Sequence, residues 1–151
     1  MEPSFERLLA LLGDGGVKFV VVGGVAVTLH GYVRLTEDLD VLVDPSPRNI
    51  GALLSALANW GEGFARELSP DDFPDEEGAV RVVEETERCQ IDIFTRMSGL
   101  RYPDLIKDAA TFPLRGHLIR FASIDVLIRL KETSFREKDR IDVIALRRIR
   151  E

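Results

Sequence analysis

The chain has 151 residues, of which 45% are hydrophobic and 30% are charged, and its net charge is −6 at pH 7. This length and composition are typical of globular proteins, and we predict one domain over residues 1–151. No apolar run approaches the roughly 20 residues of a membrane span, and the N-terminus lacks a signal-peptide pattern. We therefore expect a cytoplasmic protein that does not enter a membrane.

The distribution of charge and cysteine narrows the function classes. The acidic net charge argues against a general nucleic-acid binder, although residues 129–151 carry a local excess of lysine and arginine. These basic residues form either an ordinary solvated helix face or a surface patch that binds a triphosphate or RNA. The single cysteine, Cys89, excludes an internal disulfide and a cysteine-based zinc cluster.

The first predicted elements are a helix and a buried strand. Apolar side chains at helical spacing predict a packing helix over Ser4–Leu12, with Ser4 as its cap and the glycines of residues 13–16 as its end. The continuous apolar run Phe19–Val22 predicts a strand that is buried on both faces.

Two glycines follow this strand directly. Gly23 and Gly24 allow a sharp turn and a close approach to main-chain N–H groups. A short helix over Val25–His30 would point its free N–H groups at the same place, where a phosphate is favoured. We therefore interpret Gly23 and Gly24 as a phosphate-binding turn.

The next strand, Asp38–Val43, places two carboxylates on one face. Its apolar residues alternate with Asp38 and Asp40, which lie two positions apart and can reach one point in front of the sheet. Like charges so close repel, so the pair must share a proton or bind a cation. The hard cation that uses carboxylates together with substrate phosphates is Mg²⁺.

The middle of the chain predicts a helix, a loop and a hairpin. A helix is expected over Asn49–Trp60, and the acidic, proline-containing segment Leu68–Gly78 is expected to be a loop. Strands over Val80–Glu84 and Gln90–Phe94 would form an antiparallel hairpin. In the second of these strands Asp92 stands between two isoleucines, which indicates a strand face that looks into a polar site.

The C-terminal part predicts mainly helices. A helix is expected over Pro103–Ala110, followed by a short hairpin over Leu114–Phe121. Two more helices are expected over Ile124–Lys131, capped by Ser123, and over Glu137–Ile149. Together these elements predict an α/β (α+β) fold, with a mixed sheet flanked by helices.

A glycine pair, a spacer and an acidic pair on a strand stand together in this order: Gly23-Gly24, His30-Gly31, Arg34, Thr36, Asp38-Leu39-Asp40. This run resembles the nucleotidyltransferases of the DNA polymerase beta superfamily, in the variant of the AbiEii-like toxin proteins and related small nucleotidyltransferases. Many of these proteins carry Gly-Ser at the glycine pair, and the missing serine hydroxyl here leaves only backbone donors.

The resemblance implies a set of roles. The family adds a third carboxylate on a later strand, which Asp92 matches, so that three acids would hold two Mg²⁺ ions and act in catalysis. For this arrangement Asp92 must lie on a strand adjacent to that of Asp38 and Asp40 and in phase with it. By the same resemblance Lys131 would contact the triphosphate, and Arg34 and Thr36 would support the acids or meet phosphate charge.

The function that follows is transfer of a nucleoside monophosphate from an NTP to an acceptor hydroxyl. The acceptor is left open between tRNA or other RNA, a protein and a small molecule, and a protein partner or a toxin–antitoxin or defence setting is implied by the resemblance. The alternative is a catalytically silent module of the same fold that binds a partner, as an antitoxin does.

Overall fold

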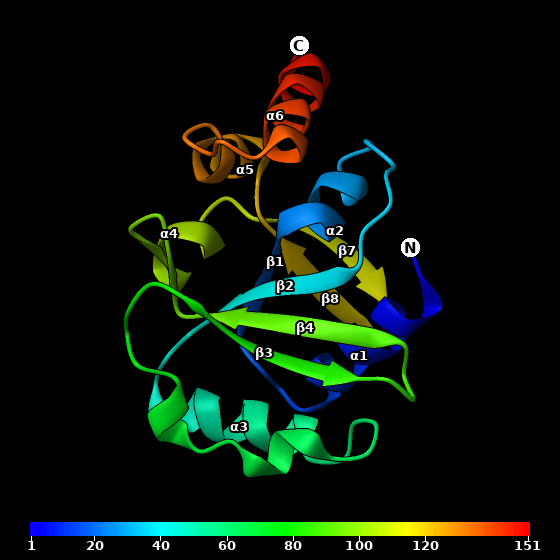
Figure 1. Cartoon of the computed structure of the whole chain (residues 1–151), viewed down its shortest axis with the longest axis vertical. Coiled ribbons are helices and arrows are strands. Elements are labelled where there is room, and N and C mark those ends of the chain that lie inside the picture. The colour runs from blue at the N-terminus through cyan, green and yellow to red at the C-terminus, as the bar shows by residue number, and fades with distance from the viewer.

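A six-stranded mixed sheet forms the centre of the protein (Figure 1). The computed structural model describes all residues from Met1 to Glu151. The strands lie in the order β3-β4-β2-β1-β8-β7. Their bounds are β1 Phe19–Val22, β2 Asp38–Val43, β3 Ala79–Glu84, β4 Cys89–Phe94, β7 Ala110–Leu114 and β8 His117–Phe121.

Helices cover the sheet. Figure 1 shows α3 on one side of the sheet and α2, α5 and α6 on the other. The α-helices are α1 Pro3–Asp14, α2 Gly23–Leu29, α3 Pro47–Leu57, α4 Tyr102–Ile106, α5 Ile124–Lys131 and α6 Glu137–Arg150. The predicted fold class, a mixed sheet flanked by helices, is confirmed.

The pairing at the centre of the sheet decides the geometry of the site. β2 runs antiparallel to β1 and parallel to β4, and β4 continues antiparallel to β3. β1 is also parallel to β8, and β7 and β8 form a hairpin. The two strands that carry aspartates are therefore direct neighbours, although the chain forms a helix, two short 3-10 turns and another strand between them.

One face of the central strands is apolar and forms the core. The register places Leu39 beside Ile91 and Val41 beside Ile93, and all four side chains are buried. Because side chains alternate along a strand, this fixes the residues between them on the opposite face. Burial of the apolar side chains therefore fixes the strand phase.

Several predicted boundaries differ from the observed ones. The first helix begins at Pro3 with Glu2 as its cap position, so Ser4 lies inside the helix and does not cap it. The helix expected over Pro103–Ala110 ends at Ile106, because Ala110 already pairs with Phe121 in the sheet.

Two further differences concern short elements. The segment expected to be a loop contains a 3-10 turn over Pro70–Asp72, after an earlier one over Phe64–Glu67. The small hairpin of β5 Arg96–Met97 and β6 Leu100–Arg101 was not predicted. Two-residue strands carry no alternation pattern that a sequence could show. No helix is long and apolar enough to cross a membrane.

Asn49 joins the ends of the two central strands to α3. It is buried, and its Oδ1 accepts a hydrogen bond from the Lys18 N–H (2.7 Å). Its Nδ2 donates to the carbonyls of Lys18 (2.9 Å) and Asp44 (2.7 Å). One side chain therefore satisfies three backbone groups where the chain enters β1 and leaves β2.

We expect Asn49→Ala to lower the free energy of unfolding by about 3 kcal/mol, because it leaves three backbone groups without their partner. Urea denaturation measures this change. Ser46→Ala is the control, since it removes only the hydroxyl that caps α3 (Asn49 N to Ser46 Oγ, 3.3 Å) and should lower the same quantity by about 1 kcal/mol. Equal effects of the two substitutions would contradict the role assigned to Asn49.

Candidate active site

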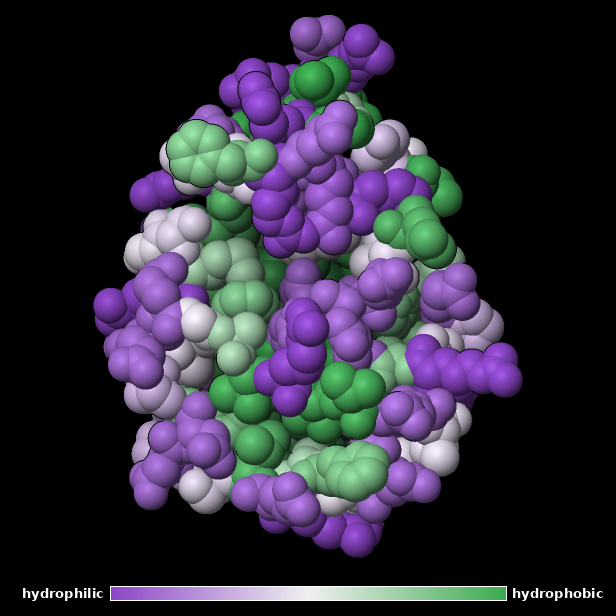
Figure 2. All heavy atoms as spheres, in the orientation of Figure 1, coloured by the Kyte–Doolittle hydropathy of each residue, from purple (hydrophilic) through white to green (hydrophobic).

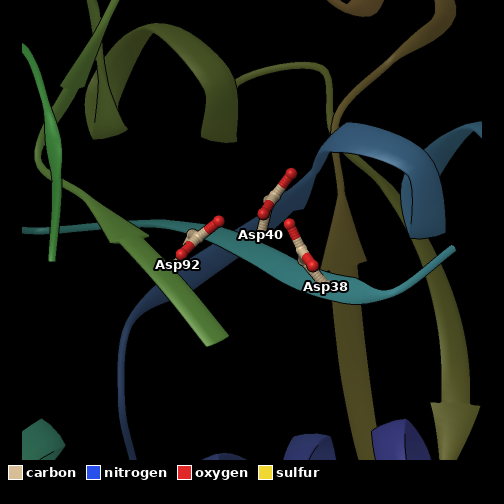
Figure 3. Close-up of side chains that lie close together, drawn as sticks. All are labelled: Asp38, Asp40 and Asp92. Atoms are coloured by element: carbon tan, nitrogen blue, oxygen red, sulfur yellow. The ribbon is translucent and has the colours of Figure 1, made fainter. Parts of the chain in front are cut away.

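Three aspartates from two neighbouring strands converge on one side of the sheet (Figure 3). Asp38 and Asp40 lie on β2 and Asp92 lies on β4, where Asp92 is the direct partner of Asp40. One carboxylate oxygen of each residue lies within 4.8 Å of the others. The predicted placement of Asp92, on an adjacent strand and in phase, is confirmed.

Asp40 is the acid at the centre of this group. Burial, followed by the nearby charges of Asp92 and Asp38, raises its pKa from 3.8 to about 7, while the charge of Lys131 acts in the opposite direction. Its Oδ1 is buried and has no hydrogen-bond partner. A buried carboxylate oxygen without a donor is costly and is therefore suited to a cation.

The other two acids have partners. Arg81 on β3 forms a bidentate pair with Asp92, from Nε to Oδ1 (2.7 Å) and from Nη2 to Oδ2 (2.9 Å). The same Nη2 lies 3.5 Å from Asp38 Oδ2, and the Gln90 side-chain amide donates to Asp38 Oδ1. Both outer acids thus have hydrogen-bond partners on the neighbouring strands, and Asp92 has a close counter-ion as well.

Glycines are required at positions 23 and 24 because the main chain there passes very close to other side chains of the site. Gly23 has a φ of +67°, and a Cβ there would collide with the carboxylate of Asp40. A Cβ on Gly24 would lie 2.9 Å from both Thr36 Oγ1 and Arg34 Nη2. The helix predicted over Val25–His30 is observed as α2 over Gly23–Leu29, so it begins at the glycine pair. The sharp turn after β1 lies at Gly23, which is the glycine of the pair with a positive φ.

The basic residues of the site are held by α6. Arg34 forms a bidentate pair with the fully buried Asp142, at 2.7 and 2.8 Å. The hydrogen bonds that Arg34 donates to the Asp142 carboxylate raise the pKa of Arg34 above its ordinary value. Lys131 Nζ lies 2.8 Å from Asp139 Oδ1 and 3.1 Å from Asp142 Oδ2. Asp142 therefore joins the loop before β2 to the end of α5.

All of the site residues that the sequence predicts line one cavity of about 400 Å³. Figure 2 shows a hollow near the middle of the molecule, with hydrophilic residues above and below it and hydrophobic residues on its left side. A second cavity of about 460 Å³ lies beside the segment 33–36, but it contains none of the three aspartates. The predicted residues in the first cavity are Gly23, Gly24, Arg34, Thr36, Asp38, Asp40, Asp92 and Lys131.

Sequence reasoning missed two residues that contact the acids. Arg81 lies directly opposite Asp92 in the β3–β4 hairpin, and Gln90 lies directly opposite Asp38 between β4 and β2. The signal for Arg81 is present in the sequence, because the length of the predicted hairpin turn sets which residues of its strands face each other. The pairing of Gln90 with Asp38 depends on strands that are far apart in the sequence.

The donor set of the three aspartates fits a hard divalent cation. It consists only of carboxylate oxygens, which are the ligands that Mg²⁺ prefers. The unpartnered Oδ1 of Asp40 and its raised pKa both show that this carboxylate lacks the positive charge that its ionised form needs. Asp38, Asp40 and Asp92 are thus the residues that could hold a metal.

The fold and the acidic group define a protein of the nucleotidyltransferase class. A family model described as "Nucleotidyl transferase of unknown function (DUF2204)" matches residues 3–151, and the chain belongs to this family. The chain is also similar in fold to the crystal structure of an antigenic nucleotidyltransferase-like protein from Paracoccidioides brasiliensis. The TM-score is 0.52 at 17% identity, over 93% of this chain and 72% of that chain. No curated protein sequence matches the chain.

The raised pKa of Asp40 predicts a pH dependence of stability. The folded value is about 7 and the ordinary value is 3.8, so the unfolded chain loses this proton at lower pH than the folded protein. The stabilisation by the neutral side chain is therefore lost as pH rises from about 4 to about 7. Asp40→Asn cannot lose a proton and should escape this loss.

We expect the free energy of unfolding of Asp40→Asn, relative to the natural protein, to rise by about 1.4 kcal/mol per pH unit between pH 5 and pH 6.5. Urea denaturation in the presence of EDTA measures the difference. Asp125→Asn, an exposed acid on α5, serves as the control and should show a flat difference. A flat difference for Asp40→Asn as well would contradict the raised pKa.

Proposed function

We propose that the protein is a metal-dependent nucleotidyltransferase, which moves a nucleoside monophosphate from an NTP to an acceptor hydroxyl. The observation that carries this proposal is the convergence of Asp38, Asp40 and Asp92, whose carboxylate oxygens lie within 4.8 Å of one another. Membership in a nucleotidyltransferase family supports the reaction class. In this reaction the acceptor oxygen bonds to the α-phosphorus of the NTP and pyrophosphate leaves.

The three carboxylates would hold Mg²⁺ in a two-ion site. The ions would supply positive charge at the attacking and leaving oxygens of the displacement. Asp38 and Asp40 lie on the strand that follows the glycine turn, and Asp92 lies on the side that faces β3. We assign to Asp92 the additional role of accepting the proton of the acceptor hydroxyl, because its strand lies farther from that turn.

The opposite wall of the cavity would bind the triphosphate. Gly23 and Gly24 place backbone N–H groups there without a side chain, and Thr36 Oγ1 beside Gly24 is buried without a hydrogen-bond partner. That hydroxyl would take the place of the serine hydroxyl that many relatives provide at the glycine pair. Arg34 and Lys131 supply positive charge on this wall, and their carboxylate partners on α6 fix them in position.

The proposal specifies the acceptor only as a molecule that carries a hydroxyl group. A hydroxyl of an RNA, of a protein or of a small molecule satisfies the same chemistry. A protein partner and a toxin–antitoxin or defence setting enter through the family resemblance of the motif around Gly23 and Asp38.

We expect Asp38→Asn and Asp40→Asn each to reduce nucleotidyl transfer by at least about 100-fold, because each removes a metal ligand and charge stabilisation of the transition state. Labelled NTPs incubated with total RNA and lysate protein, with and without Mg²⁺, measure the transfer and show which molecule acquires the label. Circular dichroism should show that both variants keep the fold. Asp125→Asn is the matched control and should keep full activity. Unfolding of both site variants would show that the acids are structural.

A catalytically silent module is the second candidate, and nucleotide binding separates the two. An active site of this kind should bind an NTP with Mg²⁺, and a ligand at 100 times its Kd adds about 2.7 kcal/mol to the free energy of unfolding. We expect a rise in melting temperature with Mg²⁺ and at least one of the four NTPs, and no rise in Asp40→Asn. The absence of a shift with every nucleotide would favour the silent module.

A further inference from the structure

Arg81 is the one basic residue that bonds directly to the acidic group. Its Nε and Nη2 donate to the two oxygens of Asp92 at 2.7 and 2.9 Å, and its Nη2 lies 3.5 Å from Asp38 Oδ2. The register of β3 and β4 fixes this contact, since Arg81 and Asp92 are direct partners. The guanidinium therefore occupies the side of the group that faces β3.

This contact conflicts with metal binding by the same carboxylates. Both oxygens of Asp92 already accept a charge-assisted hydrogen bond in the plane of the carboxylate. Mg²⁺ requires near-octahedral geometry at about 2.0–2.1 Å from its ligands and carries two positive charges. A guanidinium and a divalent cation cannot share these oxygens without strong repulsion, because like charges at such distances repel.

The position of Arg81 allows it to move. Its side chain is 55% exposed, whereas the side chain of Asp92 is 9% exposed. Its hydrogen bonds to side chains go to Asp92 and Asp38 alone. Nothing else therefore holds the guanidinium over the site.

We propose that Arg81 is the resident counter-ion of Asp92 and Asp38 in the metal-free protein and that it competes with divalent cations for these two carboxylates. Arg81 is a positioning residue in this account, because it acts through the aspartates. The inference rests on the proposed function in one respect, namely that the three aspartates bind metal. It adds that the metal affinity of the site is set in part by a cation that the chain itself supplies.

The test measures Mn²⁺ binding to the whole protein without nucleotide, from the electron paramagnetic resonance signal of free Mn²⁺ at low ionic strength. We expect Arg81→Met to bind Mn²⁺ about fivefold more tightly than the natural protein, because it keeps much of the apolar stem and removes the competing charge. Arg81→Lys should fall between them, since an ammonium group cannot pair with both oxygens in the same plane.

Arg88→Met is the matched control. Arg88 lies in the turn of the same hairpin and is exposed, and it forms no ion pair in the structure. The substitution therefore removes the same charge from the same hairpin without touching the acids. If Arg88→Met changes the Mn²⁺ affinity much less than Arg81→Met does, the change in net charge alone does not explain the effect of Arg81→Met.

A second readout separates competition from a structural role. In EDTA, Arg81→Met should melt at a lower temperature than the natural protein, because the acids lose their counter-ion. With saturating Mn²⁺ this gap should close or reverse. An equal gap under both conditions is the result expected of a merely structural arginine, and it would overturn the inference.

The binding results distinguish the possible failures. Equal or weaker Mn²⁺ binding by Arg81→Met than by the natural protein would overturn the inference, and if Asp40→Asn abolishes binding the metal site itself would stand. Mn²⁺ binding that survives in Asp40→Asn would overturn the inference and the proposed metal site together. The absence of Mn²⁺ binding in both the natural protein and Arg81→Met would do the same. Should Arg81→Met fail to fold, the Mn²⁺ affinity and melting behaviour of Arg81→Lys decide the question in the same way.

Discussion

The convergence of three carboxylates on one face of the sheet is the constraint on which the rest of this structure depends. Two like charges 4 Å apart repel by about 4 kcal/mol at an effective dielectric constant of 20, so three ionised aspartates within 4.8 Å need compensation. The side chains of the protein provide it in three ways. Arg81 pairs with Asp92, Gln90 donates to Asp38, and Asp40 keeps its proton up to a pH of about 7.

The elements around the acids are arranged so that this group can exist. Burial of the apolar face of β2 and β4 keeps the aspartates in phase, because a slip of one residue would turn them into the core. Gly23 lets α2 begin directly against Asp40, where any side chain would collide with its carboxylate. The apolar core and the glycine turn therefore position the charged group.

The last helix gives the cavity its second wall. Asp142 and Asp139 on α6 hold Arg34 and Lys131 by ion pairs of 2.7 to 3.1 Å, so that basic side chains stand opposite the acidic strands. The basic side chains suit the negatively charged phosphates of the proposed substrate, and the acidic strands suit the metal ions that the proposed reaction requires.

The sequence by itself determined which side chains share a face on the central strands and where the main helices and strands of the sheet lie, within a few residues. Alternation over Asp38–Val43 and the pattern Ile-Asp-Ile around Asp92 are local properties with a period of two, and both predictions were confirmed. The extent of the helix after Pro103 was wrong because pairing of Ala110 with Phe121 overrides local helical preference. Only the tertiary structure decided that Arg34 bonds to Asp142, 108 residues away, and that Gln90 bonds to Asp38, 52 residues away. Such contacts depend on which strands and helices become neighbours, and local periodicity does not contain that information.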